Sequence, residues 1–435
     1  MKRFFWGGVH PAAHKELTHT PELTVLPAPA QVIVPLSQHI GAPAQPLVAV
    51  GDYVTMGQKI GDGQGLCVPV HAPVSGKVSA IGEYPHPGGV RPAIVIENDF
   101  QNTFASSLRP HGAEEALEAK EILSIIREAG IVGMGGAAFP TAVKANVPEG
   151  QVDVIIVNAC ECEPYITADD TLLQTHPEQV VDGLKLLCRV MKPRRAVIAV
   201  EDNKPAAIAA VRKALASAPE LEVLKLHTRY PQGAEKQLIQ AVTGRQVMAG
   251  KLPKDVGCAV FNAATCAAIS QAVRDGMPLI QRIVTVTGSA VNTPGNFLVR
   301  IGTTFSQVVE AAGGLRDNVW KVLSGGPMMG VAQPNLDAPV VKFVNCVLCL
   351  SQAENAEVEN PVCFRCGKCV EVCPMHLQPL YLHRYTKSGS LPLLKRYNIM
   401  DCIECGCCAY TCPGKIPLVA SIRTGKKLIK EESVT

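Results

Sequence analysis

The spacing of the cysteines is the most informative chemical feature of this sequence. Eleven of its 17 cysteines lie between Cys346 and Cys412, and eight of the eleven fall in two runs with the spacing C-x2-C-x2-C-x3-C-P. In this spacing, three thiolates on one tight loop bind one [4Fe–4S] cubane, and the fourth cysteine reaches the other cluster. The sequence therefore predicts two clusters, one held by Cys363, Cys366, Cys369 and Cys412, the other held by Cys402, Cys405, Cys408 and Cys373.

Other interpretations exist for the cysteines of this region. The duplicated pattern favours clusters over a zinc module or free thiols. Cys407 falls between ligands of the second run and is interpreted as a spectator thiol. Cys346 and Cys349 form a lone C-x2-C in an apolar stretch, which fits either a core strand or a further metal site.

A glycine-rich stretch in the middle of the chain could hold a phosphate or a flat ring. It contains Gly133, Gly135 and Gly136 and is followed by Lys144. Glycines let backbone N–H groups approach a ligand closely, and a lysine adds positive charge. Taken by itself, the pattern fits a plain tight turn equally well.

Polar residues follow an apolar run downstream of this loop. Residues 152–157 and 195–200 are short apolar runs, and their alternation with helical patterns predicts βαβ units and a parallel sheet. Asn158, Glu161 and Glu163 come directly after the first run. Because open parallel sheets bind ligands outside the carboxyl ends of their strands, we expect a binding site here. The alternative is a set of acidic turns on the surface of an α/β domain.

These motifs carry a resemblance to a known family. Residues 133–144, 158–164, 230–235 and 262–265 resemble motifs of the FMN- and NADH-binding flavoprotein subunit of respiratory complex I. The opening F-W-G-G-V-H-P, the segment N-A-C-E-C-E-P-Y-I-T-A-D-D and the two cysteine runs are closer still to the RnfC family, a component of the Rnf complex, the ion-translocating ferredoxin:NAD+ oxidoreductase. The likeness covers nearly the whole chain.

The resemblance implies a role for the residues of these motifs. The residues that would contact FMN are Gly133, Gly135, Gly136, Lys144, Asn158, Glu161, Asn262 and Thr265. Those that would face the nicotinamide nucleotide are Phe139, Glu163 and Glu235. The chain departs from the complex I pattern at Met134, where arginine is usual, and at Ala234, where glutamate is usual. Because FMN would carry the hydride chemistry, no side chain is expected to act as a catalyst.

The elements that must position these motifs are expected to form four domains, so the predicted fold class is multidomain α/β. In chain order these are a barrel-sandwich β domain (1–110), a Rossmann-like α/β flavin domain (111–277), a β-grasp soluble-ligand-binding domain (278–340) and a helical domain like a bacterial two-cluster ferredoxin (341–435). The first resembles biotinyl and lipoyl domains, but Gly65 stands near the place of their carrier lysine. We therefore expect this domain to serve as a docking or bracing domain, and not to carry a covalently attached group.

Composition limits the possible classes of function. The 435 residues correspond to about three average domains, and 47% hydrophobic residues are enough for buried cores. A net charge of +3 and 5% aromatic residues argue against nucleic-acid binding. We find no apolar run of about 18 residues or more, so we expect this chain to have no membrane span of its own.

The resemblance implies a peripheral subunit on the cytoplasmic face of the cell inner membrane. FMN would exchange a hydride with NAD(H), and single electrons would pass through the two [4Fe–4S] clusters to or from membrane subunits that translocate Na+ or H+. Its partners would be the other Rnf subunits, including a ferredoxin-like one. The alternatives are a cobalamin reductase of a diol-utilisation microcompartment and a plain electron relay that binds neither flavin nor nucleotide.

Overall fold

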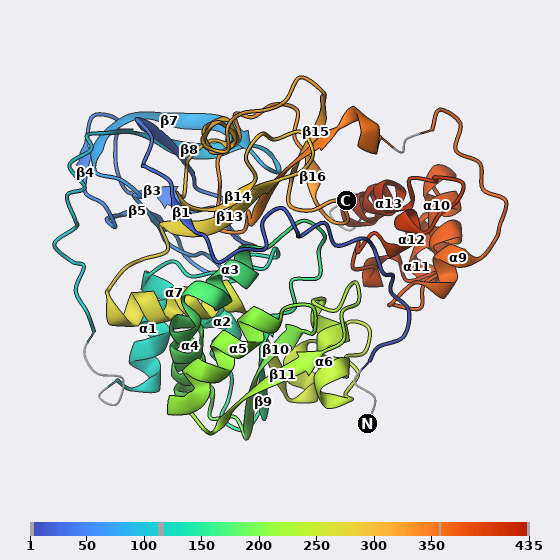
Figure 1. The fold of residues 1–435 in the computed structure, drawn as a ribbon, viewed down its shortest axis with the longest axis horizontal. Coiled ribbons are helices and arrows are strands. Elements are labelled where there is room, and N and C mark those ends of the chain that lie inside the picture. Colours follow the sequence, from blue (N-terminus) through green and yellow to red (C-terminus); the bar gives the residue numbers. More distant parts are fainter. Residues whose placement is uncertain (1–3, 112–116, 356–357, 433–435) are drawn as a thin grey trace.

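The described residues form four sheets, the helices that pack on two of them and a C-terminal group of helices. The structure is a computed structural model, and it describes residues 4–111, 117–355 and 358–432. Figure 1 shows the α/β part below, two β-rich parts above it and the C-terminal helices at the right. No helix among the described residues combines the length and the hydropathy that a membrane crossing requires.

Two small sheets share one apolar core in the N-terminal part. Their strand orders are β2-β8-β7-β4 and β3-β5-β6. The strands are β2 (Gln31–Pro35), β3 (Gln45–Pro46), β4 (Tyr53–Val54), β5 (Lys59–Asp62), β6 (Val70–His71), β7 (Gly76–His86) and β8 (Gly89–Asn98). Val32 and Val34 alternate along β2 and are fully buried against Ile60 of the other sheet. This arrangement agrees with the predicted barrel sandwich.

The middle part is a parallel sheet with helices packed against it. Its strands are β9 (Val154–Ala159), β10 (Arg195–Glu201), β11 (Leu221–Leu226) and β12 (Cys258–Asn262). Its helices are α1 (Ala119–Glu128), α2 (Thr141–Ala145), α3 (Ala168–Thr175), α4 (Pro177–Met191), α5 (Pro205–Ala214), α6 (Glu235–Thr243) and α7 (Ala263–Arg274). The predicted parallel sheet is confirmed, and the two apolar runs named above form β9 and β10, its inner strands.

The direction of strand addition reverses next to β9. The sheet order is β11-β10-β9-β12, so the chain adds strands on one side of β9 and then returns to its other side. Asn158 and Asn262 stand opposite each other in the register of β9 and β12. Open α/β sheets bind ligands at such a switch point, outside the carboxyl ends of the strands. Two of the predicted flavin residues therefore lie side by side at that edge.

A six-stranded sheet forms the second β-rich part. Its elements are β1 (Thr24–Val25), β13 (Gln281–Thr287), β14 (Gly295–Arg300), α8 (Phe305–Ala311), β15 (Val319–Ser324), β16 (Val331–Ala332) and β17 (Cys346–Ser351). β17 lies beyond residue 340, where we expected the domain to end, and pairs with β13 and β15. All its residues are buried, so the interpretation of Cys346 and Cys349 as parts of a core strand is confirmed.

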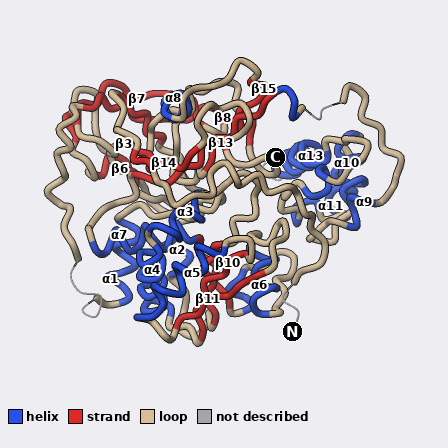
Figure 2. The backbone as a smooth tube through the Cα atoms, viewed as in Figure 1, coloured by secondary structure: helices blue, strands red, loops and turns tan. Residues whose placement is uncertain are grey.

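The C-terminal part repeats one backbone course twice. Its helices are α9 (Lys368–Glu371), α10 (Pro379–Lys387), α11 (Leu391–Arg396), α12 (Cys407–Tyr410) and α13 (Leu418–Glu432), drawn in blue at the right of Figure 2. Arg365 and Glu404 have φ of 57° and 56°, and Gly367 and Gly406 both have φ of 82°. These left-handed residues occupy matching places in the two cysteine runs, so each run turns in the same way before its short helix.

Residues 5–20 form an irregular segment that we call the N-terminal strap. In Figure 1 the strap is the dark blue chain that passes beside the C-terminal helices and then crosses the middle of the molecule. Gly8 N–H donates to the carbonyl of Val372 (2.8 Å), and the carbonyl of Ala13 accepts from Tyr165 N–H (2.8 Å). The strap therefore contacts both the cysteine-rich part and the α/β part.

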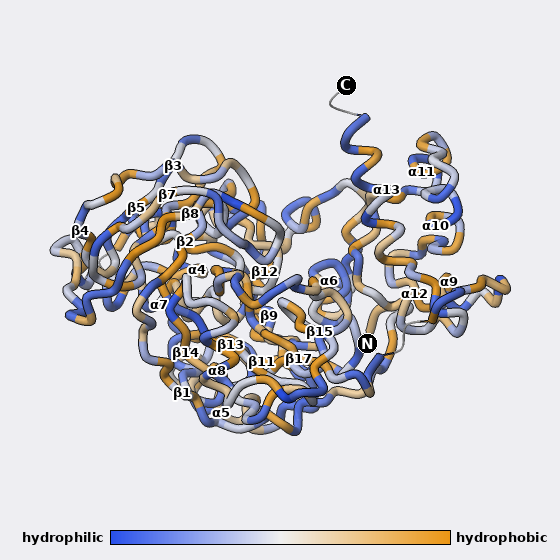
Figure 3. Tube along the Cα trace, turned by 90° about the horizontal axis from the view of Figure 1, so that it is seen from above, coloured by the Kyte–Doolittle hydropathy of each residue, from blue (hydrophilic) through white to orange (hydrophobic). Residues whose placement is uncertain are grey.

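Hydrophobic residues concentrate along the buried strands. Figure 3 shows them along β2 and β9, whereas hydrophobic and hydrophilic residues alternate along α13. The largest apolar core lies between the parallel sheet and helices α1, α4, α5 and α7. Burial of this core fixes the strands, and the loops at the strand ends are positioned by them.

Candidate functional site

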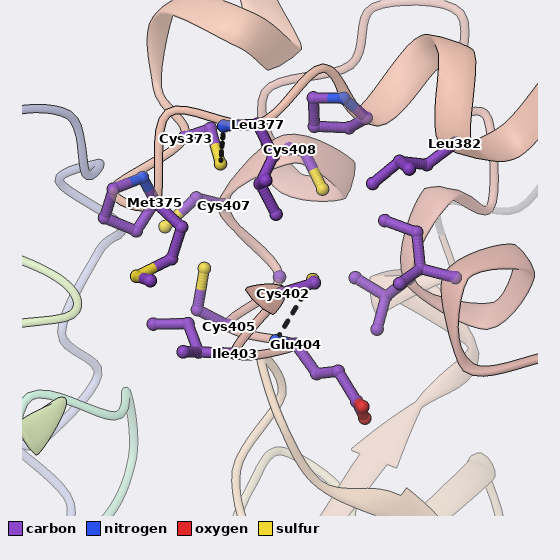
Figure 4. Close-up of a pocket in the computed structure, with 15 residues that line it drawn as sticks. Cys373, Met375, Leu377, Leu382, Cys402, Ile403, Glu404, Cys405, Cys407 and Cys408 are labelled. Atoms are coloured by element: carbon purple, nitrogen blue, oxygen red, sulfur yellow. Dashed lines mark hydrogen bonds between the residues drawn. The ribbon is translucent and has the colours of Figure 1, made fainter. Parts of the chain in front are cut away.

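Four cysteines from both runs surround one cavity, which we call the inner cavity. Cys373, Cys402, Cys405 and Cys408 line it together with apolar side chains, and Figure 4 shows them around the space. The empty space measures about 360 Å³, part of it open to solvent. Cys407 also lines this cavity and packs against Val9 and Tyr230 in an apolar cluster. The structure thus brings together the four residues of one predicted ligand set.

The other four cysteines surround a second space, the outer cavity. Cys363, Cys366, Cys369 and Cys412 line it, together with Phe364 and other residues. It measures about 380 Å³, again partly open to solvent. Cys363 and Cys366 are exposed, and so is Phe364, whose exposed fraction is 63%. The second predicted ligand set is therefore also gathered in one place.

Both cavities have the chemistry of an iron–sulfur site. Backbone N–H groups of Leu377, Glu404 and Ile416 donate to sulfur atoms of the cysteine set at 3.3, 3.4 and 3.5 Å. Such donors stabilise the negative charge of cluster-binding thiolates. Among the described residues, no group of three His, Cys, Asp or Glu side chains is placed to hold a single metal ion. Four sulfurs spread around each space fit a [4Fe–4S] cluster, in which each thiolate binds a different iron.

The glycine-rich loop presents open backbone at the edge of the parallel sheet. Gly135 and Gly136 are exposed, and Gly136 has a φ of 124° with open space where a side chain would stand. A Cβ at Gly135 would approach the Asn262 side chain to 3.3 Å, and Gly133 is half-buried. This cradle fits a flat ring or a phosphate, because the exposed Gly135 and Gly136 let a ligand approach the backbone closely.

Polar side chains fasten this loop to the strand ends. Thr265 Oγ1 accepts from Met134 N–H (2.9 Å) and donates to the carbonyl of Val132 (3.3 Å). Asn262 caps α7, since its Oδ1 accepts from Thr265 N–H, and its Nδ2 donates to Asp169 (2.6 Å). The Asn158 amide donates to the carbonyl of Gly233 (2.8 Å). The loop, β9 and β12 are therefore joined around the switch point.

The Glu161 carboxylate lies in a buried ionic network. Its Oε2 pairs with Lys204 Nζ at 2.9 Å, and its Oε1 accepts from Asp169 N–H at 2.9 Å. Burial alone would raise the pKa of Glu161, but the ammonium groups of Lys204 and Lys15 outweigh burial and lower it. Burial and the nearby Glu161 raise the pKa of Asp169 to about 7. Both Glu161 oxygens thus have protein partners, which orient the loop after β9.

The three residues predicted to face a nicotinamide nucleotide lie in different settings. Glu163 Oε1 accepts from the backbone N–H groups of Met328 (2.7 Å) and Met329 (3.0 Å), and burial raises the pKa of this carboxyl group. Glu235 pairs with Lys144 at 2.7 Å and both side chains are part-exposed. Phe139 is half-buried in the glycine-rich loop, where its carbonyl accepts from Gly133 N–H (2.9 Å).

The loop after β11 and helix α6, which follows it, join the parallel sheet to the inner cavity. Tyr230 O–H donates to the carbonyl of Cys405 at 2.7 Å, and Gln237 donates to the carbonyl of Pro374 at 3.1 Å. Gly233 N–H donates to Cys162 Sγ at 3.3 Å, next to the Gly233 carbonyl that accepts from Asn158. The inner cavity therefore adjoins the α/β part directly.

Several residues of this site could not be inferred from sequence. The position of Lys204 in a polar stretch after the β10 run indicates that it lies near the binding edge of the sheet. Nothing in the sequence links it to Glu161. Lys15 and Met328 reach the site from remote segments, and Tyr230 belongs to a motif found in the sequence, although its contact with Cys405 was not predicted. Their roles depend on contacts that only the folded chain creates.

A parallel sheet with an open glycine-rich loop at its switch point, joined to two four-cysteine cavities, defines a class of flavin- and iron–sulfur-dependent electron-transfer proteins. Four family models match the chain in agreement with this class. They are the RnfC barrel sandwich hybrid domain at residues 3–101, the Nuo51 FMN-binding domain at 126–271, the SLBB domain at 283–332 and the 4Fe-4S dicluster domain at 362–416.

Curated relatives identify the family. The chain is 47% identical to the RnfC protein of the Na+-translocating ferredoxin:NAD+ oxidoreductase complex of Acetobacterium woodii, over 98% of this chain and 97% of the relative. It is 45% identical to the RnfC protein of the proton-translocating complex of Clostridium ljungdahlii, over 92% and 88% of the two chains. This chain belongs to the RnfC family, as the sequence motifs predicted.

A solved structure shares the fold. The NAD+-reducing [NiFe]-hydrogenase in its H2-reduced state aligns with a TM-score of 0.51 at 20% identity, over 74% of this chain and 65% of the hydrogenase chain. At this identity the likeness concerns the arrangement of elements alone.

Proposed function

We propose that this chain is the NAD(H)-reactive electron-transfer subunit of an ion-translocating ferredoxin:NAD+ oxidoreductase complex. One observation carries the proposal: the inner cavity packs on the same α/β part that bears the FMN-binding motif, through the Tyr230–Cys405 and Gln237–Pro374 hydrogen bonds. Bound FMN supplies two-electron exchange with NAD(H) and one-electron exchange with iron–sulfur clusters. The chain itself supplies position, charge and exclusion of water.

We assign FMN to the glycine-rich loop and the adjacent strand ends. Open backbone at Gly135 and Gly136 supports close approach of the ring and ribityl phosphate, and the half-buried Gly133 is assigned to the same cradle. Lys144 offers positive charge for the phosphate, with Thr265 and Asn262 at the phosphate end. Asn158 and Glu161 are assigned to the flavin, and Phe139, Glu163 and Glu235 to the nicotinamide nucleotide. The residues assigned as cluster ligands are Cys363, Cys366, Cys369 and Cys412 for the outer cavity and Cys373, Cys402, Cys405 and Cys408 for the inner cavity.

The domain boundaries follow the same scheme. We assign residues 1–110 to the barrel sandwich, 111–277 to a Rossmann-like flavin domain, 278–351 to a domain of β-grasp type and 352–435 to a two-cluster ferredoxin-like domain. The third domain extends past residue 340 because β17 pairs with β13 and β15. The relatives are named as subunits of translocating complexes, which supports partnership with the other subunits of such a complex. We place this chain with them on the cytoplasmic face of the inner membrane. Ion movement then belongs to those partner subunits.

Anaerobic NADH titration of protein loaded with FMN and iron–sulfur clusters tests the function. We expect NADH to bleach the iron–sulfur absorbance, because the inner cavity adjoins the flavin domain. Glu163→Gln and Glu235→Gln each replace a carboxylate at the assigned nucleotide site by an uncharged amide of nearly the same shape, and we expect the KM for NADH to change by about tenfold.

The matched control is Glu149→Gln, which removes an exposed carboxylate that pairs with Lys192 on the same domain. Its KM for NADH should equal that of the unmodified chain. A chain that binds no FMN, or whose clusters NADH never bleaches, would be a plain relay. If the Glu163 and Glu235 variants behave like the Glu149 variant, the nucleotide site lies elsewhere.

A further inference from the structure

Lys15 of the N-terminal strap places its ammonium group inside the loop that follows β9. Its Nζ donates to the carbonyl of Glu161 at 2.9 Å, to that of Glu163 at 3.0 Å and to that of Ile166 at short range. The residue is 8% exposed, and the first of these carbonyls lies 146 residues further along the chain. The ammonium group therefore uses all three of its donors on one loop.

Other contacts of the loop after β9 with the strap lie next to the Lys15 ammonium group. Tyr165 has a φ of 69°, a backbone conformation that residues other than glycine seldom adopt. Its N–H donates to the carbonyl of Ala13 in the strap. The His14 ring stacks on the Tyr165 ring at a centroid distance of 4.7 Å. Residues 13–15 of the strap thus meet the loop through backbone, ring and charge.

Burial makes the Lys15 contacts costly to lose. Burial and the neighbouring Lys204 lower the pKa of Lys15 to about 8, although Glu161, Glu201 and Cys162 act in the opposite direction. A buried carbonyl without a partner costs the free energy of its lost hydration, so three carbonyls left together would make the loop rearrange. The loop carries Glu161 and Glu163, which the proposed function places at the flavin and the nicotinamide.

The same strap is fastened to the ligand loop of the inner cavity. Gly8 N–H donates to Val372, the neighbour of Cys373, and a Cβ at Gly7 would stand 3.0 Å from the Cys373 carbonyl. Val9 and Tyr230 exchange backbone hydrogen bonds of 2.8 and 3.0 Å. One short segment therefore contacts the loop of the α/β part at one end and the cluster loop at the other.

We propose that Lys15 is a positioning residue for the flavin and nucleotide site: its ammonium group holds the carbonyls of residues 161, 163 and 166 and so fixes the loop that meets FMN. This assignment rests on the proposed function. It gives the N-terminal strap a part in cofactor binding, although no strap side chain is assigned to touch the cofactor.

The test uses the full chain with its clusters, titrated with FMN while the quenching of flavin fluorescence is followed. Lys15→Met keeps the length of the side chain and removes the three donors. We expect the Kd for FMN to rise about tenfold, because the loop loses its fixed shape. Hydrogen–deuterium exchange should quicken in residues 160–167 and stay unchanged in residues 372–378. The control is Glu22→Gln, an exposed carboxylate just after the strap, and it should match the unmodified chain.

A Kd for FMN within twofold of the unmodified value overturns the assignment, as does faster exchange throughout the chain. If Lys15→Met does not fold, Lys15→Arg tests the assignment by the same two measurements, the Kd for FMN and hydrogen–deuterium exchange. A planar guanidinium cannot direct three N–H groups from one centre, so its Kd should rise at least threefold, and a value within twofold overturns the assignment. If the unmodified chain itself binds no FMN, the proposed function fails, and faster exchange of residues 160–167 in Lys15→Met still supports the loop-holding role.

Discussion

The inner and outer cavities share a backbone course but differ in what surrounds them. Both are formed by loops with left-handed residues at matching places, such as Gly367 and Gly406. Around the inner cavity, Cys405 and Cys408 are only 7% and 8% exposed, and the α/β part covers one side. Around the outer cavity, Cys363 lies open to solvent.

This difference separates two kinds of information in the cysteine runs. Spacing decides which sulfurs can meet, because a short loop brings them together in either half. The surrounding fold decides what each cluster can exchange electrons with and how water and hydrogen bonds set its potential. We expect the inner cluster to exchange electrons with the flavin domain, and the outer cluster to exchange them with another protein.

Removal of one ligand from each cavity should give the largest contrast. Cys405→Ala and Cys366→Ala should each reduce the iron content from about eight to about four per chain, since each loses one four-iron cluster. In Cys405→Ala the outer cluster should no longer be reduced by NADH, because the inner cavity adjoins both the flavin domain and the outer cavity. In Cys366→Ala the inner cluster should still be reduced. Iron analysis and electron paramagnetic resonance after NADH addition measure both effects. Equal reduction of the remaining cluster by NADH in the two variants would contradict the expected path from the flavin through the inner cluster to the outer cluster.

The two matching glycines allow a sharper comparison. Gly367→Ala meets open space, so it should cost only the strain of the left-handed backbone, about 1 kcal/mol. Gly406→Ala places a Cβ 2.6 Å from the carbonyl of Met328, so it should cost about 3 kcal/mol and displace the loop that binds Glu163. Thermal unfolding of the two variants checks this difference. Equal losses of stability in the two variants would mean that the Met328 loop does not pack tightly against Gly406 in the inner ligand loop.

Chemical access should differ between the two cavities in protein without clusters. Alkylation requires an accessible thiolate. Because Cys363 and Cys366 are exposed while Cys405 and Cys408 are buried, iodoacetamide should modify the first pair about tenfold faster. Mass spectrometry of timed digests gives the rates, with urea-unfolded protein as the reference in which all four should react alike. Similar rates in the folded protein would mean that the inner cavity opens freely.

The smallest effect concerns Tyr230. Tyr230→Phe removes the hydrogen bond to the carbonyl of Cys405, which is worth about 1 kcal/mol, and with it an O–H dipole near the inner cluster. We expect the potential of the inner cluster to fall by roughly tens of millivolts, while that of the outer cluster stays constant. Redox titration resolves the two signals. Tyr410→Phe, at a residue that is 50% exposed, is the matched control, and a shift there of the same size would refute the assignment.

Local patterns predicted much of this architecture. The cysteine spacing gave two sets of four residues, and the structure gathers each set around its own cavity. Apolar runs located β9 and β10, because a strand buried on both faces needs a continuous apolar sequence. The lone C-x2-C of Cys346 and Cys349 left a choice that only the sheet pairing of β17 settled.

Contacts between distant segments were beyond such patterns. Lys15 and Met328 touch the loop after β9 through backbone carbonyl and N–H groups, which every residue possesses and no motif marks. Glu161 was predicted to bind the flavin on the strength of its motif, yet its partnership with Lys204 depends on how β10 ends beside β9. The assignments to FMN and the nucleotide remain predictions for the experiments above.

The course of the N-terminal strap also sets an order of events during protein synthesis. A chain is made from its N-terminus, and domains begin to fold as they emerge. The strap emerges before its partners, because Gly8 binds Val372 and Lys15 binds carbonyls 146 or more residues later. The contact of Gly8 with Val372 must therefore wait until the first cysteine run has left the ribosome. The inner ligand loop is therefore uncovered just after its synthesis, and we expect iron and sulfide to enter before the strap packs over it.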